Sequence, residues 1–216
     1  MKSSEISAMV VHRLPRYYRF LLDMEAEGLE KTSSAELAER MNLNASQIRQ
    51  DLNCFGGFGQ QGYGYHIPTL RAELAELLGV ENPRRAIVLG TGNMGRALAN
   101  YAAFNKKGLS LIGLFDIDPA LVGQTCGGLT VLHTRDLDSF CQRRKPEVAI
   151  LCVNQQAART LCPELVQCGI KGFINFSHYD ILSDFPQVQV ENVHIGDAML
   201  ALSYKLGRSE SSGEEK

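Results

Sequence analysis

The segment Ala86-Ile87-Val88-Leu89-Gly90-Thr91-Gly92-Asn93-Met94-Gly95-Arg96-Ala97-Leu98 decides the fold of the second part of the chain. Its apolar start predicts a buried strand, and the glycines that follow have the spacing G-x-G-x-x-G ahead of a helix. In that pattern the first glycine allows a tight turn, the second lets a ligand approach the backbone, and the third lets the helix pack closely on the strand. A second apolar run over 109–115 ends in Asp116, roughly 20 residues after the last glycine. Together these features predict an α/β fold with a Rossmann-type, doubly wound parallel sheet.

The same loop predicts a site for a nicotinamide dinucleotide, NADH or NAD+. The free N–H groups and the positive end of the helix after Gly92 suit a pyrophosphate. Asp116 can accept both hydroxyls of a ribose, and its charge would repel a 2′-phosphate, which favours NAD over NADP. Further strands are expected over 148–153 and 172–176, with a helix over 157–168, and ligands lie beyond the carboxyl ends of such strands. The residues expected to bind the coenzyme are Gly90, Thr91, Gly92, Asn93, Met94, Gly95, Asp116, Val153, Asn154 and Asn175.

The first part of the chain is predicted to be helical, with one glycine-rich interruption. Pro15 suits the first turn of a helix that ends at Gly28. Ser33 and Glu36 have the spacing of a capping box at the start of a second helix, and Asn44 caps a third. Two short helices joined by a tight turn match a helix-turn-helix.

The third helix would be the one that enters the major groove of DNA. Arg49 on its outer side could contact a guanine with two hydrogen bonds, although a polar outer face is also what any surface helix shows. The glycine-rich stretch 56–65 predicts a hairpin that serves as a wing after the helix-turn-helix. Basic and acidic residues nearly balance in this part, so a basic surface toward DNA would be local. The residues expected to contact DNA are Ser46, Gln47, Arg49, Gln50 and Tyr63.

Composition and charge narrow the classes of function. Hydrophobic residues make up 44% of the 216 residues and charged residues 21%, with a net charge of −2, as in an ordinary globular protein. No apolar run approaches the roughly 20 residues that cross a bilayer, and no secretory signal is apparent, so we expect a cytoplasmic protein without a membrane partner. The six cysteines contain no C-x-x-C pair, which favours reduced thiols over a zinc site or a disulfide framework.

The sequence offers little for catalysis. Residues 86–206 have room for one dinucleotide fold and a terminal helix, with no separate substrate domain. His178 and Asp180 lie two residues apart in one loop, without a nearby arginine to hold a carboxylate substrate. We therefore expect no catalytic residues and no metal ligands, and a coenzyme site without chemistry indicates sensing.

Taken together, these features resemble the Rex family of redox-sensing transcriptional repressors. The resemblance rests on the segments Leu14–Arg19, Gln47–Leu52, Phe58–Tyr65, Gly90–Gly95, Phe115–Pro119, Gly169–Gly172 and Asn175–Phe176. It implies a homodimer in which the C-terminal helix of each chain packs against the partner. It also implies repression from palindromic operators in double-stranded DNA, from which NADH releases the protein. The domains expected on this basis are a winged-helix DNA-binding domain (1–79), a linker (80–85), an NAD(H)-binding Rossmann domain (86–195), a dimer-exchanged helix (196–207) and a disordered tail (208–216).

The resemblance also implies roles for single residues. Arg49 corresponds to the arginine that reads bases, and Tyr63 belongs to the wing. Arg19 and Tyr101 correspond to members of a polar network that links the winged helix, the coenzyme domain and the partner's terminal helix. His194 stands where the family has an aspartate in this network, and Asp197, one helical turn further on, can take the place of that carboxylate.

Further departures from the family pattern leave more than one function open. Gln50 stands where a lysine is usual, and Gln60 and Gln61 stand where the wing is usually basic. These changes remove phosphate contacts, and His194 alters the network, which keeps open a DNA-binding regulator with a weakened or altered redox response. A small NAD-dependent dehydrogenase and a nucleotide- or CoA-binding module are also compatible with the glycine loop. Asp116 at the end of the second strand favours the ribose of a dinucleotide over CoA.

Overall fold

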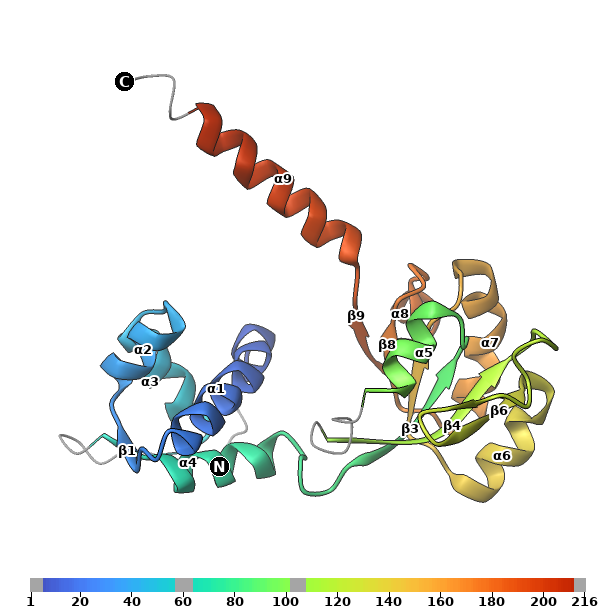
Figure 1. Ribbon diagram of the computed structural model, residues 1–216, viewed down its shortest axis with the longest axis horizontal. Coiled ribbons are helices and arrows are strands. Elements are labelled where there is room, and N and C mark those ends of the chain that lie inside the picture. Colours follow the sequence, from blue (N-terminus) through green and yellow to red (C-terminus); the bar gives the residue numbers. More distant parts are fainter. Residues whose placement is uncertain (1–5, 57–63, 102–107, 212–216) are drawn as a thin grey trace. The chain divides into compact units, whose positions relative to one another are not determined.

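The computed structural model describes residues 6–56, 64–101 and 108–211, and the side chains of these ranges up to residue 207 (Figure 1). The chain divides into two compact units, Met1–Asn82 and Pro83–Lys216. Each unit has a hydrophobic core of its own. Within the described residues, no helix combines the length and the apolar character needed to span a bilayer.

The first unit consists of helices and one short antiparallel ribbon. Its elements in chain order are α1 (Ala8–Ala26), β1 (Lys31–Thr32), α2 (Ser34–Met41), α3 (Ala45–Asn53), β2 (Tyr65–His66) and α4 (Ile67–Leu77). Tyr17 and Leu21 of α1 pack in one buried cluster with Ile48 and Leu52 of α3 and Leu70 of α4. This apolar core holds α3 against α1 and leaves the opposite side of α3 exposed to solvent.

Local hydrogen bonds explain the turn between α2 and α3. The Ser33 hydroxyl accepts a hydrogen bond from the backbone N–H of Glu36 at 3.1 Å and starts α2. Asn42 ends α2 in the left-handed conformation, with φ of 51°. The Asn44 side chain then accepts from the N–H of Ser46 at 2.8 Å and starts α3. Both predicted caps are present, and the helix-turn-helix is confirmed.

The prediction that Pro15 stands in the first turn of a helix is wrong. α1 begins at Ala8, so Pro15 lies inside it. Proline cannot donate a hydrogen bond to the carbonyl four residues earlier, which is that of Val11. The helix continues through this position because Val10 and Leu14 are both buried in the core and Pro15 itself is exposed.

Most of the predicted wing lies outside the described residues, including Tyr63, Gln60 and Gln61. Its last part, β2, pairs antiparallel with β1, a strand that the sequence pattern did not indicate. Gly64, which leads into β2, has φ of +74°, and a Cβ atom there would overlap the carbonyl oxygen of Thr32. Only glycine suits this close approach of the two strands.

The second unit is built on a seven-stranded sheet with the order β5-β6-β4-β3-β7-β8-β9. The strands are β3 (Arg84–Leu89), β4 (Leu109–Asp116), β5 (Thr125–Cys126), β6 (Leu129–His133), β7 (Val148–Leu151), β8 (Gly172–Asn175) and β9 (Gln189–Asn192). The helices are α5 (Asn93–Ala99), α6 (Leu137–Arg144), α7 (Gln155–Gln167), α8 (Ile181–Asp184) and α9 (Ile195–Ser211), with a 3-10 turn at Thr134–Asp136. All strand pairs are parallel except β5 with β6.

Helices cover both faces of this sheet. Ile87 and Leu89 of β3 belong to the cluster that contains the buried residues of α6 and α7. Val88, between them, belongs to the cluster on the other face, with Ala99 of α5. Successive side chains of a strand point to opposite faces, so a continuous apolar run is what a strand buried on both sides requires. The predicted Rossmann-type doubly wound sheet is confirmed.

Several boundaries differ from those expected. β3 begins at Arg84, so the end of the predicted linker 80–85 belongs to the strand, where Arg84 pairs with Glu147 at 2.7 Å. β7 ends at Leu151 and β8 at Asn175, each earlier than predicted. The elements β5, β6, α6 and β9 were not predicted from the sequence. Their shortness and weak apolar patterns explain why.

The terminal helix α9 is longer than expected. It begins at Ile195 and continues to Ser211, so the prediction of disorder is wrong for 208–211. Arg and Glu have good helix propensity, and extending an existing helix avoids the cost of nucleation. The residues after Ser211 lie outside the described part. The exposed large apolar side chains of α9 are Ile195, Met199, Leu200, Leu202, Tyr204 and Leu206.

Candidate functional site

The glycine loop between β3 and α5 is shaped by backbone contacts. Gly90 has φ of +89°, and a Cβ atom there would lie 2.5 Å from the carbonyl oxygen of Cys152. A Cβ atom at Gly95 would overlap the carbonyl oxygen of Gly90. At Gly92, the N-cap of α5, a Cβ atom would meet nothing within 4 Å. Two of the glycines are therefore needed for packing, and the third leaves open space beside the start of a helix, where backbone N–H groups lack intrahelical partners.

Asp116, at the carboxyl end of β4, holds this loop in shape. Its Oδ2 accepts hydrogen bonds from the N–H of Thr91 at 2.6 Å and the Thr91 hydroxyl at 2.9 Å. Its Oδ1 accepts from the N–H groups of Ile117 at 2.8 Å and Asp118 at 3.0 Å. Burial raises the pKa of Asp116, but these hydrogen bonds lower it more, so the net pKa lies below its usual value. The carboxylate is ionised and already accepts four hydrogen bonds. Ribose hydroxyls that reach it would donate beside these groups or take their place.

The two asparagines predicted at strand ends have local partners. The Asn154 side chain accepts from the N–H of Ala157 at 2.9 Å and caps α7. Asn175 is fully buried, and its Nδ2 donates to the Tyr179 carbonyl and to Asn192 Oδ1. Its Oδ1 accepts from the N–H and hydroxyl of Ser177. Asn175 thus orders the loop after β8 and does not line the cavity described next.

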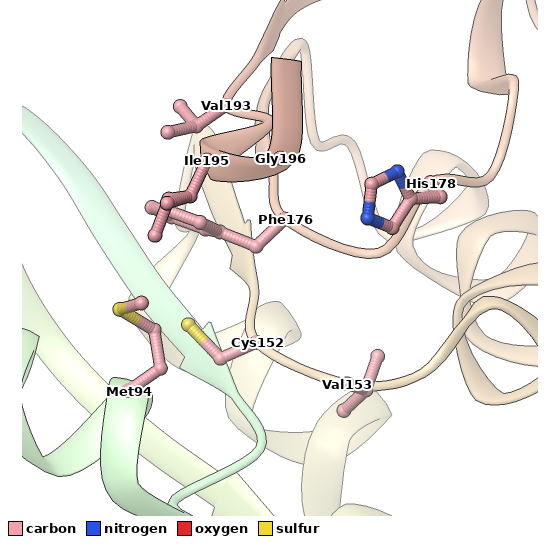
Figure 2. A pocket seen from close by; sticks show the side chains of 8 residues that line it. All are labelled: Met94, Cys152, Val153, Phe176, His178, Val193, Ile195 and Gly196. Atoms are coloured by element: carbon pink, nitrogen blue, oxygen red, sulfur yellow. The ribbon is translucent and has the colours of Figure 1, made fainter. Parts of the chain in front are cut away.

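A cavity of about 260 Å³ lies beside the glycine loop, where several segments of the second unit meet (Figure 2). Of the predicted coenzyme residues, it brings together Met94 at the start of α5 and Val153 after β7. The full lining is Met94, Cys152, Val153, Phe176, His178, Val193, Ile195 and Gly196. Most of these side chains are apolar, so the cavity suits an uncharged ring better than a charged one.

Sequence reasoning missed most of this lining. Phe176 and His178 follow β8, Val193 follows β9, and Ile195 is the first residue of α9. The apolar residues just beyond the strand ends were a usable signal for the segments after β7 and β8. The contribution of the segment before α9 depends on β9, which the sequence did not reveal.

Two histidines stack at this place in the second unit. The ring centroids of His178 and His194 are 4.4 Å apart, with 21° between the ring planes. His194 Nδ1 lies 3.4 Å from a carboxylate oxygen of Asp197, one turn into α9. Within the described residues, no group of three or more His, Cys, Asp or Glu side chains has an arrangement that could hold a metal ion.

The outer face of α3 carries the side chains predicted to contact DNA. Ser46, Arg49 and Gln50 are exposed. Arg49 donates to the hydroxyls of Ser34 at 2.8 Å and Ser46 at 3.1 Å, which hold its guanidinium on the surface of α2 and α3. Gln47 is half-buried, and its Nε2 donates to Asp51 Oδ1 at 2.8 Å, so its amide is partly engaged within the unit.

Asp51 is a residue that the sequence interpretation overlooked. Its carboxylate is completely buried and accepts two hydrogen bonds from Arg13, at 2.6 and 2.8 Å, and one from the Tyr17 hydroxyl at 2.5 Å. Burial raises the pKa of Asp51, but the hydrogen bonds from Arg13, Tyr17 and Gln47 bring it below its usual value. The buried carboxylate therefore links α3 to α1. Its place one turn after Ile48, on the inner face of the helix, was the available signal.

The residues predicted to form an interdomain switch are divided between the two units. Arg19 belongs to the first, where it is exposed and its guanidinium lies 5.9 Å from the Phe20 ring centroid. Tyr101, His194 and Asp197 belong to the second. The predicted network between Arg19 and the other three stays a prediction.

Comparisons with known proteins agree over both units. Residues 5–53 match the family described as a putative DNA-binding protein N-terminus, and residues 81–179 match the CoA binding domain family. The redox-sensing transcriptional repressor Rex of Caldicellulosiruptor saccharolyticus is 44% identical over 206 residues, which cover 95% of this chain and 93% of the relative. The protein of the same name from Clostridium perfringens is 40% identical over 210 residues, which cover 97% and 98%.

Solved structures are similar over nearly the whole chain. The structure described as RSP in complex with beta-NAD+ and operator DNA is 41% identical, has a TM-score of 0.89, and covers 98% of this chain and 97% of its own. The structure of RSP in complex with beta-NADH is 38% identical, has a TM-score of 0.88, and covers 99% of this chain and 100% of its own.

Proposed function

The chain belongs to the Rex family of redox-sensing transcriptional repressors, and we propose that it binds operator DNA and releases it when its coenzyme site takes up NADH. In this function it responds to the ratio of NADH to NAD+. The observation that carries the proposal is that one chain combines an exposed α3 face with a glycine loop beside an apolar cavity. A relative of the same fold over 98% of the chain is described in complex with both NAD+ and operator DNA.

The residues of the second unit fit a nicotinamide dinucleotide. The open space at Gly92 and the first N–H groups after it would accept the pyrophosphate. Asp116 and the backbone that it orders would face the adenosine ribose. The cavity between Met94, Val153 and Phe176 would receive the nicotinamide ring. When bound, the coenzyme supplies a ring whose charge depends on its redox state.

The apolar lining gives a physical reason for preferring NADH. The nicotinamide ring of NAD+ carries a positive charge and that of NADH does not, and burying a charge without an anion beside it is unfavourable. A tenfold preference requires only about 1.4 kcal/mol. Release of DNA then requires that NADH bind one conformation of the dimer better than the other, by a coupling free energy of ~1–3 kcal/mol.

A homodimer is part of the proposal. The exposed apolar side chains of α9 would be covered by a partner chain, which agrees with the exchanged terminal helix that the family resemblance implies. A two-fold dimer presents its two recognition helices to half-sites about one helical turn apart, so the operator is expected to be palindromic. A repressor of this kind acts on the chromosome, and we therefore expect it in the cytoplasm, without enzymatic activity.

The decisive experiment titrates the two coenzymes separately into a protein–operator complex. The operator is first selected from a random pool of double-stranded DNA, and binding is followed by fluorescence anisotropy of a labelled duplex. NADH is expected to release the DNA at a concentration at least tenfold lower than NAD+ does. Equal effects of the two coenzymes would contradict redox sensing, and no effect of either would indicate a regulator without this switch.

Arg49 is expected to carry sequence readout in this complex. Replacing it by alanine should weaken specific binding by ~1–3 kcal/mol, because a bidentate contact to guanine would be lost. Arg40→Ala is the control, since Arg40 lies on α2 and pairs with Glu27 at 2.8 Å. For each variant, fluorescence anisotropy with the selected operator and with a scrambled duplex separates the loss of specific binding from the loss of non-specific binding. An equal loss of affinity for both duplexes in Arg49→Ala would assign Arg49 to the phosphates instead.

The match of residues 81–179 to the CoA binding domain family makes a CoA-binding module the second candidate. The same titration tests it when CoA is added as a competitor of NADH. Displacement of NADH by CoA at a comparable concentration would favour that candidate. Steady turnover of NAD+ with a panel of hydroxy acids would revive the third candidate, a small dehydrogenase.

A further inference from the structure

The stacked histidines His178 and His194 are a polar feature at the apolar cavity. His178 lines the cavity (Figure 2), and its ring stacks on that of His194, which contacts Asp197. The Nε2 atom of His194 is buried and has no hydrogen-bond partner among the described residues. The pair is therefore a polar cluster with unused hydrogen-bonding capacity at the edge of a largely apolar cavity.

The two imidazole rings are the groups of this cluster that can carry a positive charge. Histidine is the side chain that ordinarily gains or loses its charge between pH 5 and 8. Two positive charges on rings whose centroids are 4.4 Å apart would repel each other. A carboxylate oxygen of Asp197 lies 3.4 Å from Nδ1 of His194, so a positive charge on this ring would have a partner of opposite charge.

Other ionisable side chains lie in the lining of the cavity and on the elements beside the pair. Cys152 is the remaining titratable side chain in the lining, and burial raises the pKa of its thiol to about 11, so it stays neutral. Carboxylates and guanidinium groups ordinarily stay charged between pH 6 and 8. Those on the neighbouring elements are Arg159 on α7, Asp180 and Asp184 around α8, Glu191 on β9 and Asp197 on α9.

We propose that the His178–His194–Asp197 cluster is a specificity determinant that makes the choice between NADH and NAD+ depend on pH. A proton on the stacked pair adds a positive charge beside the cavity, which disfavours the cationic ring of NAD+ and leaves the neutral ring of NADH unaffected. The inference rests on the proposed function, because it places the nicotinamide in this cavity. It adds that the response of the protein to the ratio of NADH to NAD+ varies with pH.

The test compares coenzyme binding by the full-length protein at pH 6.0 and pH 8.0. Dissociation constants for NADH and for NAD+ are measured separately by calorimetry at constant ionic strength. The ratio of the NAD+ constant to the NADH constant is expected to be about threefold to tenfold larger at pH 6.0. This is the effect of one unit charge several ångströms away in a partly hydrated site. The change should come from NAD+, with the NADH constant nearly the same at both pH values.

Three variants assign the effect to the cluster. His178→Asn is the first, because His178 has φ of 59° and asparagine tolerates this backbone conformation. His194→Gln and the double variant follow, and each is expected to reduce the pH dependence of the ratio, which should vanish in the double variant. His66→Gln is the matched control, since His66 lies in the first unit and contacts Thr69. Circular dichroism checks that each variant is folded.

The outcomes separate this inference from the proposed function. A ratio in the unaltered protein that is the same at both pH values would overturn the inference and leave the proposed function intact. A pH dependence that is undiminished in His178→Asn, which replaces an exposed loop residue, or one that persists in the double variant, would also overturn it. Absence of binding by either coenzyme at both pH values would overturn the proposed function and this inference with it.

Discussion

Replacing Asp51 by asparagine is expected to destabilise the first unit by about 3 kcal/mol and to abolish operator binding. The substitution keeps the shape of the side chain but removes the charge that balances Arg13. It also removes acceptor capacity used by Tyr17 and Gln47. The loss is placed at the lower end of the range for a broken buried pair because 23% of the Arg13 side chain remains exposed. DNA binding depends on the Asp51–Arg13 pair because this pair fixes α3 against α1.

Hydrogen exchange of the α3 backbone amides measures this effect, since it reports local opening in one unit of a two-unit protein. Glu27→Gln is the control, because Glu27 forms an exposed pair with Arg40, and such pairs contribute about 0–1 kcal/mol. Normal protection of α3 in Asp51→Asn would show that the apolar core suffices to hold the helix.

The lowered pKa of Asp51 also predicts how the first unit responds to acid. A carboxylate whose pKa is lower in the folded state stabilises that state above its unfolded value, near 3.9, and this contribution disappears as the pH falls through the folded value. The unaltered protein should therefore lose stability below about pH 4 more steeply than Asp51→Asn does. Parallel acid-unfolding curves would contradict this assignment.

Replacing Gly95 by alanine is expected to abolish NADH binding, with at least a 100-fold loss of affinity. The added methyl group would overlap the carbonyl oxygen of Gly90. Neither atom belongs to a flexible side chain, so α5 must move away from β3. Overpacking of this kind costs ~1–3 kcal/mol or more in stability, and the moved helix no longer presents its first N–H groups to the pyrophosphate.

Gly92→Ala is the matched control in the same loop. No atom lies within 4 Å of the Cβ position there, so the melting temperature should fall less than in Gly95→Ala, by no more than the small cost of alanine at a helix N-cap. Coenzyme affinity should still fall, because the methyl group occupies the space that the backbone keeps open for a ligand. Calorimetric binding and thermal melting of the two variants distinguish the roles. Equal melting temperatures for both would contradict the packing role assigned to Gly95.

Local patterns in the sequence were sufficient for several parts of this molecule. The caps at Ser33 and Asn44 depend on hydrogen bonds that reach at most three residues along the chain. The glycine loop before α5 is also local, because a turn, a positive φ angle and a helix start all involve neighbouring residues. For this reason the helix-turn-helix and the first strand–loop–helix of the sheet could be predicted without any knowledge of distant contacts.

The cavity and the polar clusters were decided by tertiary structure. Strand order places β7 next to β3 and β8 next to β7, and only then does Phe176 meet Met94 at one cavity. Asn175 shows the same limit: its position at a strand end suggested a ligand contact, whereas distant Asn192 and the loop after β8 occupy its amide.

The amino-acid sequence by itself determined the helix-turn-helix and the strand–loop–helix on which the proposed coenzyme site depends, because glycine spacing, caps and apolar periodicity act over a few residues. Only the tertiary structure decided that Asp51 binds Arg13 of another helix and that His178 stacks on His194 across 16 positions of the chain. Such pairs form where separate elements pack together, and the energy of a buried charge or a stacked ring depends on neighbours that the order of residues does not reveal.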